Sequence, residues 1–158
     1  MSLADLVWVS VAAYGLHIVE EAVFDLPARV RRLRQVRLEW ADFYVINAFV
    51  VLLGIVCAQI ASTLPLVALA FPALMLTNSL VHIGASVASG WRYTPGIASA
   101  VLLFWPLGAA CFLKAASDAT LNFATMLGSF AIAIGLHGLL AVSLTLRDKG
   151  YFRARPTR

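Results

Sequence analysis

The stretch GLHIVEEAVF, residues 15–24, decides how many times this chain crosses a membrane. It ends the first long apolar run and carries His17, Glu20 and Glu21 where a spanning helix would meet lipid. A carboxylate at the centre of a span costs roughly 2.5–3.5 kcal/mol on the insertion scale, and less near the interface. The first run is therefore the weakest candidate span, and its assignment depends on the remainder of the chain.

The composition is that of an integral membrane protein. Of 158 residues, 61% are hydrophobic and 13% are charged, against roughly 45–50% and 25% in soluble domains. Apolar runs of about 20 residues, enough to cross a hydrocarbon core of about 30 Å, follow one another closely. They predict an all-α fold, a polytopic membrane bundle of five transmembrane helices forming a single membrane domain, residues 1–158. We place the spans near residues 3–24, 43–62, 65–89, 95–115 and 120–146.

The basic residues support five spans. Eleven of the twelve Lys and Arg residues fall after the first, third and fifth runs, and Lys114 is the exception. Five spans put those three segments on one face, and Lys and Arg accumulate in cytoplasmic loops. The N-terminus is thus expected outside and the C-terminus in the cytoplasm. The ten Arg to two Lys favour a GC-rich bacterial genome and hence a multi-pass protein of the bacterial inner (plasma) membrane.

Two basic segments are expected on that cytoplasmic face. The loop 25–42 interleaves arginines with apolar residues, which favours an amphipathic helix whose arginines, within 29–37, bind anionic lipid headgroups. The tail 147–158 is also basic. These segments account for the net charge of +4, so the charge does not indicate nucleic-acid binding.

Polar side chains of separate spans share one depth. At about 1.5 Å per residue, His17, His82 and His137 lie roughly 5–14 Å below the cytoplasmic surface, together with the glutamate pair and Asn47. His17 and the two glutamates are spaced i, i+3 and i+4, so they project from one side of a helix. No Lys or Arg lies at this depth to pair with the carboxylates. The pattern indicates a shared polar site if the first, third and fifth spans are neighbours.

Three imidazoles and two carboxylates are ligands that zinc, iron or manganese accepts. The predicted metal ligands are His17, Glu20, Glu21, His82 and His137, and the predicted supporting residues are Tyr14, Asn47, Asn78 and Tyr93. A divalent metal ion, zinc or iron, is the expected cofactor. A metal-free hydrogen-bonded network and a water-filled cavity are the other ways to offset the buried charge.

The segment HIVEE, residues 17–21, resembles the signature of the HXXEE family of bacterial membrane proteins, which has no assigned function. The similarity extends to the asparagine of FYVINAF, to the Asn-x-x-x-His of TNSLVHIG and to YTPG at 93–96. The resemblance implies a hydrophobic family with a polar centre, and it implies no reaction. We read YTPG as a turn that starts the fourth span, with Tyr93 at the interface.

The leading functional hypothesis is a metal-dependent membrane enzyme that acts on a lipidic or apolar substrate from the cytoplasmic leaflet. Glu20 and Glu21 are the predicted catalytic residues, one of them as general base in a zinc-dependent hydrolysis. An iron-dependent oxidation is the alternative chemistry. Glutamate-dependent intramembrane proteases have similar ingredients, but Asp25 stands where their EExxxR motif requires Arg.

Two other classes of function remain. A proton or metal-ion transporter or relay could use the same cluster, although the outer halves of the spans hold almost no ionisable group to continue a path. A structural membrane subunit, in which the polar cluster only locks helices together, is the third possibility. The sequence does not determine the substrate or the oligomeric state.

Overall fold

The computed structural model describes residues 1–34 and 38–148. Five helical segments in that part are long and apolar enough to span a membrane: Leu3–Val23, Trp40–Gln59, Pro65–Ala88, Ile97–Ser117 and Phe123–Leu146. The all-helical fold and the five candidate spans are confirmed. The orientation of the termini stays a prediction.

The first span is a continuous helix, α1 (Leu3–Val23), and GLHIVEEAVF lies at its C-terminal end. It begins with a capping box, in which the side chain of Ser2 accepts from the Asp5 backbone and the side chain of Asp5 accepts from the Ser2 backbone. It ends before Asp25, whose φ of 51° turns the chain into α2 (Leu26–Arg34). The polar motif therefore does not interrupt the helix.

The second span, α3 (Trp40–Gln59), begins three residues earlier than predicted. The reason is a second capping box, made by Glu39 and Asp42, which the hydropathy pattern does not reveal. Helix α2 falls within the predicted amphipathic loop 25–42. Arg37 of that loop and the basic tail from residue 149 onward lie outside the described residues.

The third and fourth spans are irregular. The third consists of α4 (Pro65–Ala68) and α5 (Ala70–Ala88). The fourth consists of α6 (Ile97–Ser99), the π-helical turn η1 (Ala100–Phe104) and α7 (Trp105–Ser117). Pro106, in the first turn of α7, has no backbone N–H to donate to the turn before it, which is consistent with the π-helical turn there.

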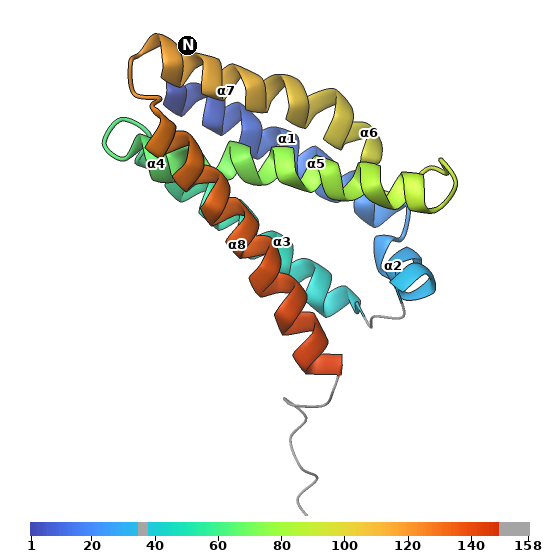
Figure 1. Ribbon diagram of the computed structural model, residues 1–158. Helices are drawn as coiled ribbons and strands as arrows, with labels where there is room; N and C mark the ends of the chain where they lie inside the picture. Colours follow the sequence, from blue (N-terminus) through green and yellow to red (C-terminus); the bar gives the residue numbers. More distant parts are fainter. Residues whose placement is uncertain (35–37, 149–158) are drawn as a thin grey trace, which may run out of the picture.

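Helix α5 is the most buried span and lies at the centre of the bundle. It packs against α8, η1 and α7, while α1 packs against α3 and α7 (Figure 1). Fully buried side chains between these helices include Val7, Phe71 and Phe104. In a membrane such packing, rather than burial from water, holds helices together.

The fifth span, α8 (Phe123–Asp148), is the least buried. It contacts α5 and α4, and its C-terminal half leaves the group formed by α1, α5 and α7 (Figure 1). Of the three spans predicted to converge, α1 and α5 are in contact. Helix α8 packs extensively against α5, but it has no extensive contact with α1.

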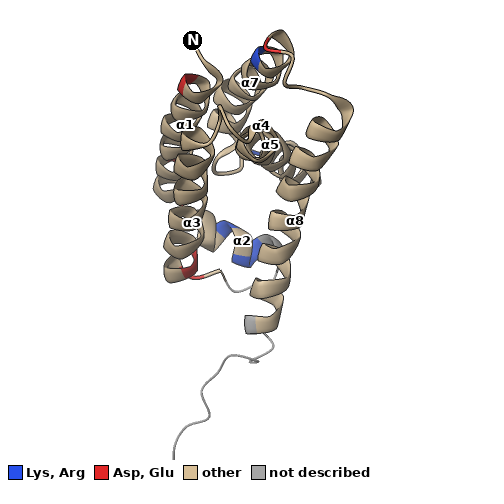
Figure 2. Ribbon diagram, turned by 90° about the vertical axis from the view of Figure 1, so that its left-hand side faces the viewer, with Lys and Arg blue, Asp and Glu red and all other residues tan. Residues whose placement is uncertain are grey.

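Described charged residues lie at both ends of the bundle. Basic residues of α2 lie at one end, and Lys114 pairs with Asp118 at the C-terminal end of α7, at the other (Figure 2). The end that carries α2 is also the end at which α1 and α5 finish and α3 begins. The polar site lies toward this end.

Candidate metal centre

Two members of the HIVEE motif form one wall of the site. His17 and Glu21 are one helical turn apart on α1, and both side chains are buried. The distance from His17 Nε2 to Glu21 Oε1 is 3.3 Å. The i, i+4 spacing places both groups on the same face of α1, as the sequence predicted.

Helix α5 contributes the third member. His82 Nε2 lies 3.3 Å from the same oxygen, Glu21 Oε1. The His17 and His82 rings meet edge to face, with centroids 4.9 Å apart. Asn78, one turn before His82, places its side-chain amide nitrogen 3.2 Å from His17 Nε2. One carboxylate oxygen thus faces two imidazoles from different spans.

The loop before the fourth span covers the cluster. Gly96 has a φ of 88°, in the left-handed region that favours glycine. A Cβ atom at this position would stand 2.6 Å from His82 Cε1, 2.7 Å from His17 Cε1 and 3.0 Å from Glu21 Cγ. The YTPG segment is the expected turn, and at Gly96 it leaves no room for a side chain beside the three members of the cluster.

Glu20 lies beside the cluster but faces the fourth span. Its carboxylate accepts hydrogen bonds from the Tyr93 hydroxyl at 2.6 Å, from the Ala98 backbone at 3.0 Å and from the Ser99 backbone at 2.7 Å. It also accepts from the Ser99 hydroxyl. Partial burial, together with the hydrogen bond to Glu20, raises the pKa of the Tyr93 phenol, so this group stays a donor. Both oxygens of Glu20 are engaged away from the histidines.

Ser99 is a site residue that the sequence analysis missed. It is buried, and its hydroxyl oxygen lies 2.9 Å from His17 Nδ1. A signal was present, because Ser99 is a polar residue near the same end of its span as the histidines. A single serine in an apolar run is common, however, and its partners are far away in sequence.

Tyr14 and Asn47 form a separate pair near the cluster. The Tyr14 hydroxyl donates to Asn47 Oδ1 at 2.8 Å, and the Asn47 amide donates to the Phe43 carbonyl at 3.0 Å. The Tyr14 ring lies 5.7 Å from the His17 ring, centroid to centroid. The pair joins α1 to α3 rather than contacting Glu21.

Replacing Tyr14 by phenylalanine should lower the free energy of unfolding in detergent by about 0.5–1.5 kcal/mol, because Asn47 Oδ1 loses its buried donor. Tyr44, which is exposed on α3, provides the matched control. Its replacement by phenylalanine should leave the unfolding free energy nearly unchanged. Equal losses in both variants would contradict a stabilising Tyr14–Asn47 bond.

His137 is not brought into the group. Its Nδ1 lies 2.9 Å from the Ala133 carbonyl of its own helix, and its side chain is partly exposed. Depth along the membrane normal placed it with the other histidines, but α8 diverges from α1. A common depth is therefore necessary for convergence and not sufficient.

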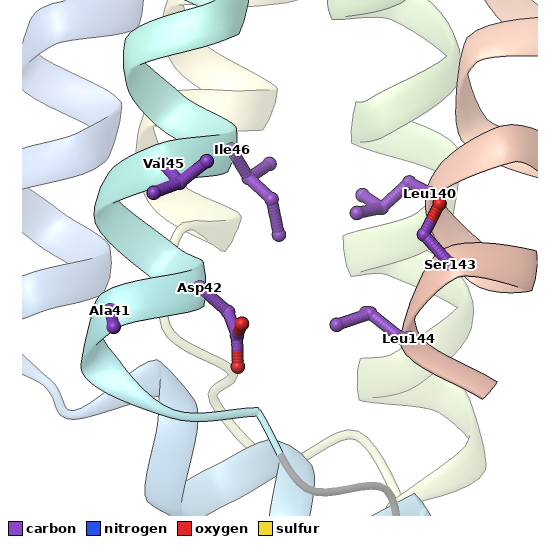
Figure 3. A pocket seen from close by; sticks show the side chains of 7 residues that line it. All are labelled: Ala41, Asp42, Val45, Ile46, Leu140, Ser143 and Leu144. Carbon is purple, nitrogen blue, oxygen red and sulfur yellow. The ribbon is translucent and has the colours of Figure 1, made fainter. Parts of the chain in front are cut away.

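An apolar pocket of about 360 Å³ opens between α3 and α8 (Figure 3). It is lined by Ala41, Asp42, Val45, Ile46, Leu140, Ser143 and Leu144. These residues lie near the start of α3 and the end of α8, at the same end of the bundle as the cluster. None of them belongs to the cluster.

The donor atoms of His17, Glu21 and His82 form a group that could hold a metal ion. All three lie within 4.8 Å of one another, and all three residues are buried. A tetrahedral zinc ion with bonds of about 2.0–2.2 Å separates its donors by about 3.3–3.6 Å. The two His-to-Glu21 distances of 3.3 Å match that separation. Three protein donors also leave a position open for water or a substrate.

The fold and the site define a class: a helical bundle with five candidate membrane spans and a buried centre of two histidines and one glutamate. A family model described as a protein of unknown function with HXXEE motif matches residues 8–111, more than half of the chain. The chain belongs to the HXXEE family, as its motifs predicted. No curated protein and no solved structure matches it. The matched residues include His17, Glu21 and His82, and they end before His137.

Proposed function

We propose that this protein binds one divalent metal ion through His17, Glu21 and His82, and that it is a metalloenzyme acting on a lipidic or apolar substrate. The observation that carries the proposal is the buried group of three donor atoms from α1 and α5. A buried carboxylate is costly unless something compensates its charge. A metal ion would compensate it and would use both imidazoles.

The donor set limits the chemistry. Two histidines with one carboxylate is a set found at catalytic zinc sites and at mononuclear iron(II) sites. Zinc in such a set activates water for hydrolysis, whereas iron(II) supports oxidation with molecular oxygen. Three protein donors are too few for a two-iron centre, for which even the five predicted ligands are few. We therefore propose a single zinc or iron ion.

The surroundings favour an apolar substrate. Candidate membrane spans surround the cluster, and the nearest rings on its inner side include Phe104, whose centroid lies 4.6 Å from that of His17. The pocket between α3 and α8 has an apolar lining of a size that suits part of an acyl chain. If the basic end is cytoplasmic, such a substrate enters from the cytoplasmic leaflet of the bacterial inner membrane, where the α2 arginines meet anionic headgroups.

Elemental analysis of detergent-purified protein tests the metal. Wild type should hold about one zinc or iron ion per chain. His82→Ala should lose the ion, because it removes one of three donors, whereas His137→Ala should keep it. If no preparation binds metal, even after incubation with zinc or iron(II), while all variants fold normally, the proposal is wrong.

A proton relay is the second candidate, and one observation favours it. Polar contacts run from the half-exposed Tyr93 through Glu20 and Ser99 to His17, and from there to Glu21 and His82. In proteoliposomes a relay predicts proton flux that disappears in Glu21→Gln. Flux without bound metal would favour the relay, and the absence of both would favour a purely structural cluster.

A further inference from the structure

The two glutamates of the motif have different partners, and this difference assigns them different roles. Glu21 faces both histidines through one oxygen. Glu20 instead accepts hydrogen bonds from Tyr93, from two backbone N–H groups at the start of the fourth span and from the Ser99 hydroxyl. Adjacent residues on a helix point about 100° apart, so one carboxylate enters the cluster and the other meets α6.

The Ser99 hydroxyl connects Glu20 to His17. The Ser99 hydroxyl has one hydrogen, and it donates this hydrogen to an oxygen. Glu20 Oε2 is the closest acceptor, and the Gly96 carbonyl oxygen lies 3.2 Å away. A hydroxyl also offers lone pairs. Toward His17 Nδ1, at 2.9 Å, the serine oxygen can therefore act only as an acceptor. This arrangement requires a hydrogen on Nδ1.

The other ring nitrogen agrees with this tautomer. In a neutral imidazole with hydrogen on Nδ1, Nε2 carries a lone pair. His17 Nε2 faces the Asn78 amide nitrogen, which is a donor, at 3.2 Å. Glu21 Oε1 lies 3.3 Å from the same nitrogen, so in the metal-free protein one proton lies between these two acceptor atoms, and a metal ion at the shared donor group would take its place. The ring is thus presented to the cluster in the form that binds metal ions.

We infer that Glu20 and Ser99 are positioning residues that hold His17 in its Nδ1–H tautomer and present Nε2 to the metal site. The inference rests on the proposed function for its purpose, but the Ser99 contacts that place a hydrogen on Nδ1 need no metal. Glu20 is not a ligand. Residues that support a metal-binding histidine in this way typically change metal affinity by 10- to 100-fold. The chain Glu20–Ser99–His17 also couples the geometry of the site to the packing of α1 against the fourth span.

Nitrogen-15 NMR of histidine-labelled, metal-free protein tests the position of the hydrogen on the His17 ring directly. The chain has three histidines, so a His17→Gln sample identifies the His17 signals. Wild-type His17 should carry its hydrogen on Nδ1. Ser99→Ala should shift it toward a mixture of tautomers, and Ser99→Thr, which keeps the hydroxyl, should restore it.

Ser79→Ala is the matched control. Ser79 is also buried, and its hydroxyl donates to the Met75 and Ala100 carbonyls and makes no hydrogen bond to His17. It should leave the tautomer unchanged. Metal affinity should fall roughly 10- to 100-fold in Ser99→Ala and stay near the wild-type value in Ser99→Thr and Ser79→Ala.

The outcomes separate this inference from the proposed function. A wild-type His17 without hydrogen on Nδ1 would overturn the inference, as would an Nδ1 signal that is unchanged in Ser99→Ala. The wild-type measurement decides the matter even if Ser99→Ala does not fold. If the tautomer is as expected but no metal binds, the positioning stands and the metal proposal fails. If metal binds but the tautomer differs, the metal proposal stands and the positioning inference fails.

Discussion

Replacing Gly96 by alanine is expected to have the largest effect of any single methyl group added to this protein. Alanine at a φ of 88° is strained, at a cost of about 1–3 kcal/mol. The added Cβ would also stand 2.6 Å from His82 and 2.7 Å from His17, and such overpacking typically costs about 1–3 kcal/mol. We expect a total loss of about 2–6 kcal/mol in unfolding free energy.

The same substitution should also abolish metal binding, because both imidazoles and Glu21 must move away from the new methyl group. Gly90→Ala separates strain from contact. Gly90 has a similar φ of 76°, but a Cβ added there would meet no atom within 4 Å. This control should lose some stability and keep its metal. If Gly96→Ala binds metal as well as Gly90→Ala does, Gly96 does not close the site.

Replacing Glu21 by glutamine should lower metal affinity by about 100-fold or more, beyond the usual effect of a supporting residue. Glutamine keeps the size of the side chain and removes the charge of the only carboxylate in the donor group. Isothermal titration with zinc, and with iron(II) under anaerobic conditions, measures the change. Asp118→Asn, at the opposite end of the bundle, is the control and should bind as wild type does.

Stability distinguishes a ligand from a structural residue at position 21. The metal-free Glu21→Gln protein should unfold at a temperature no lower than metal-free wild type, because the neutral amide is cheaper to bury than a carboxylate. With metal present, wild type should gain stability and the variant should not. A variant that is much less stable without metal, with unchanged metal affinity, would show that Glu21 acts by packing and hydrogen bonding alone.

The elements of the fold were predictable because the bilayer imposes a length on them. Apolar runs and the distribution of arginines identified five spans, including the first with its polar motif. The ends of the spans were less predictable. Capping by Glu39 and Asp42 moved the start of α3, and Pro106 accompanies a π-helical turn in the fourth span.

The sequence by itself determined that polar side chains share one depth and that His17 and Glu21 share one helical face, because both follow from rise and turn along a single helix. Only the tertiary structure decided which helices are neighbours. It brought His82 to Glu21, left His137 on a diverging helix, turned Glu20 toward the fourth span and placed Ser99 and Gly96 against His17. Lateral packing depends on the shapes of side chains over the whole bundle, and no periodicity within one helix encodes it.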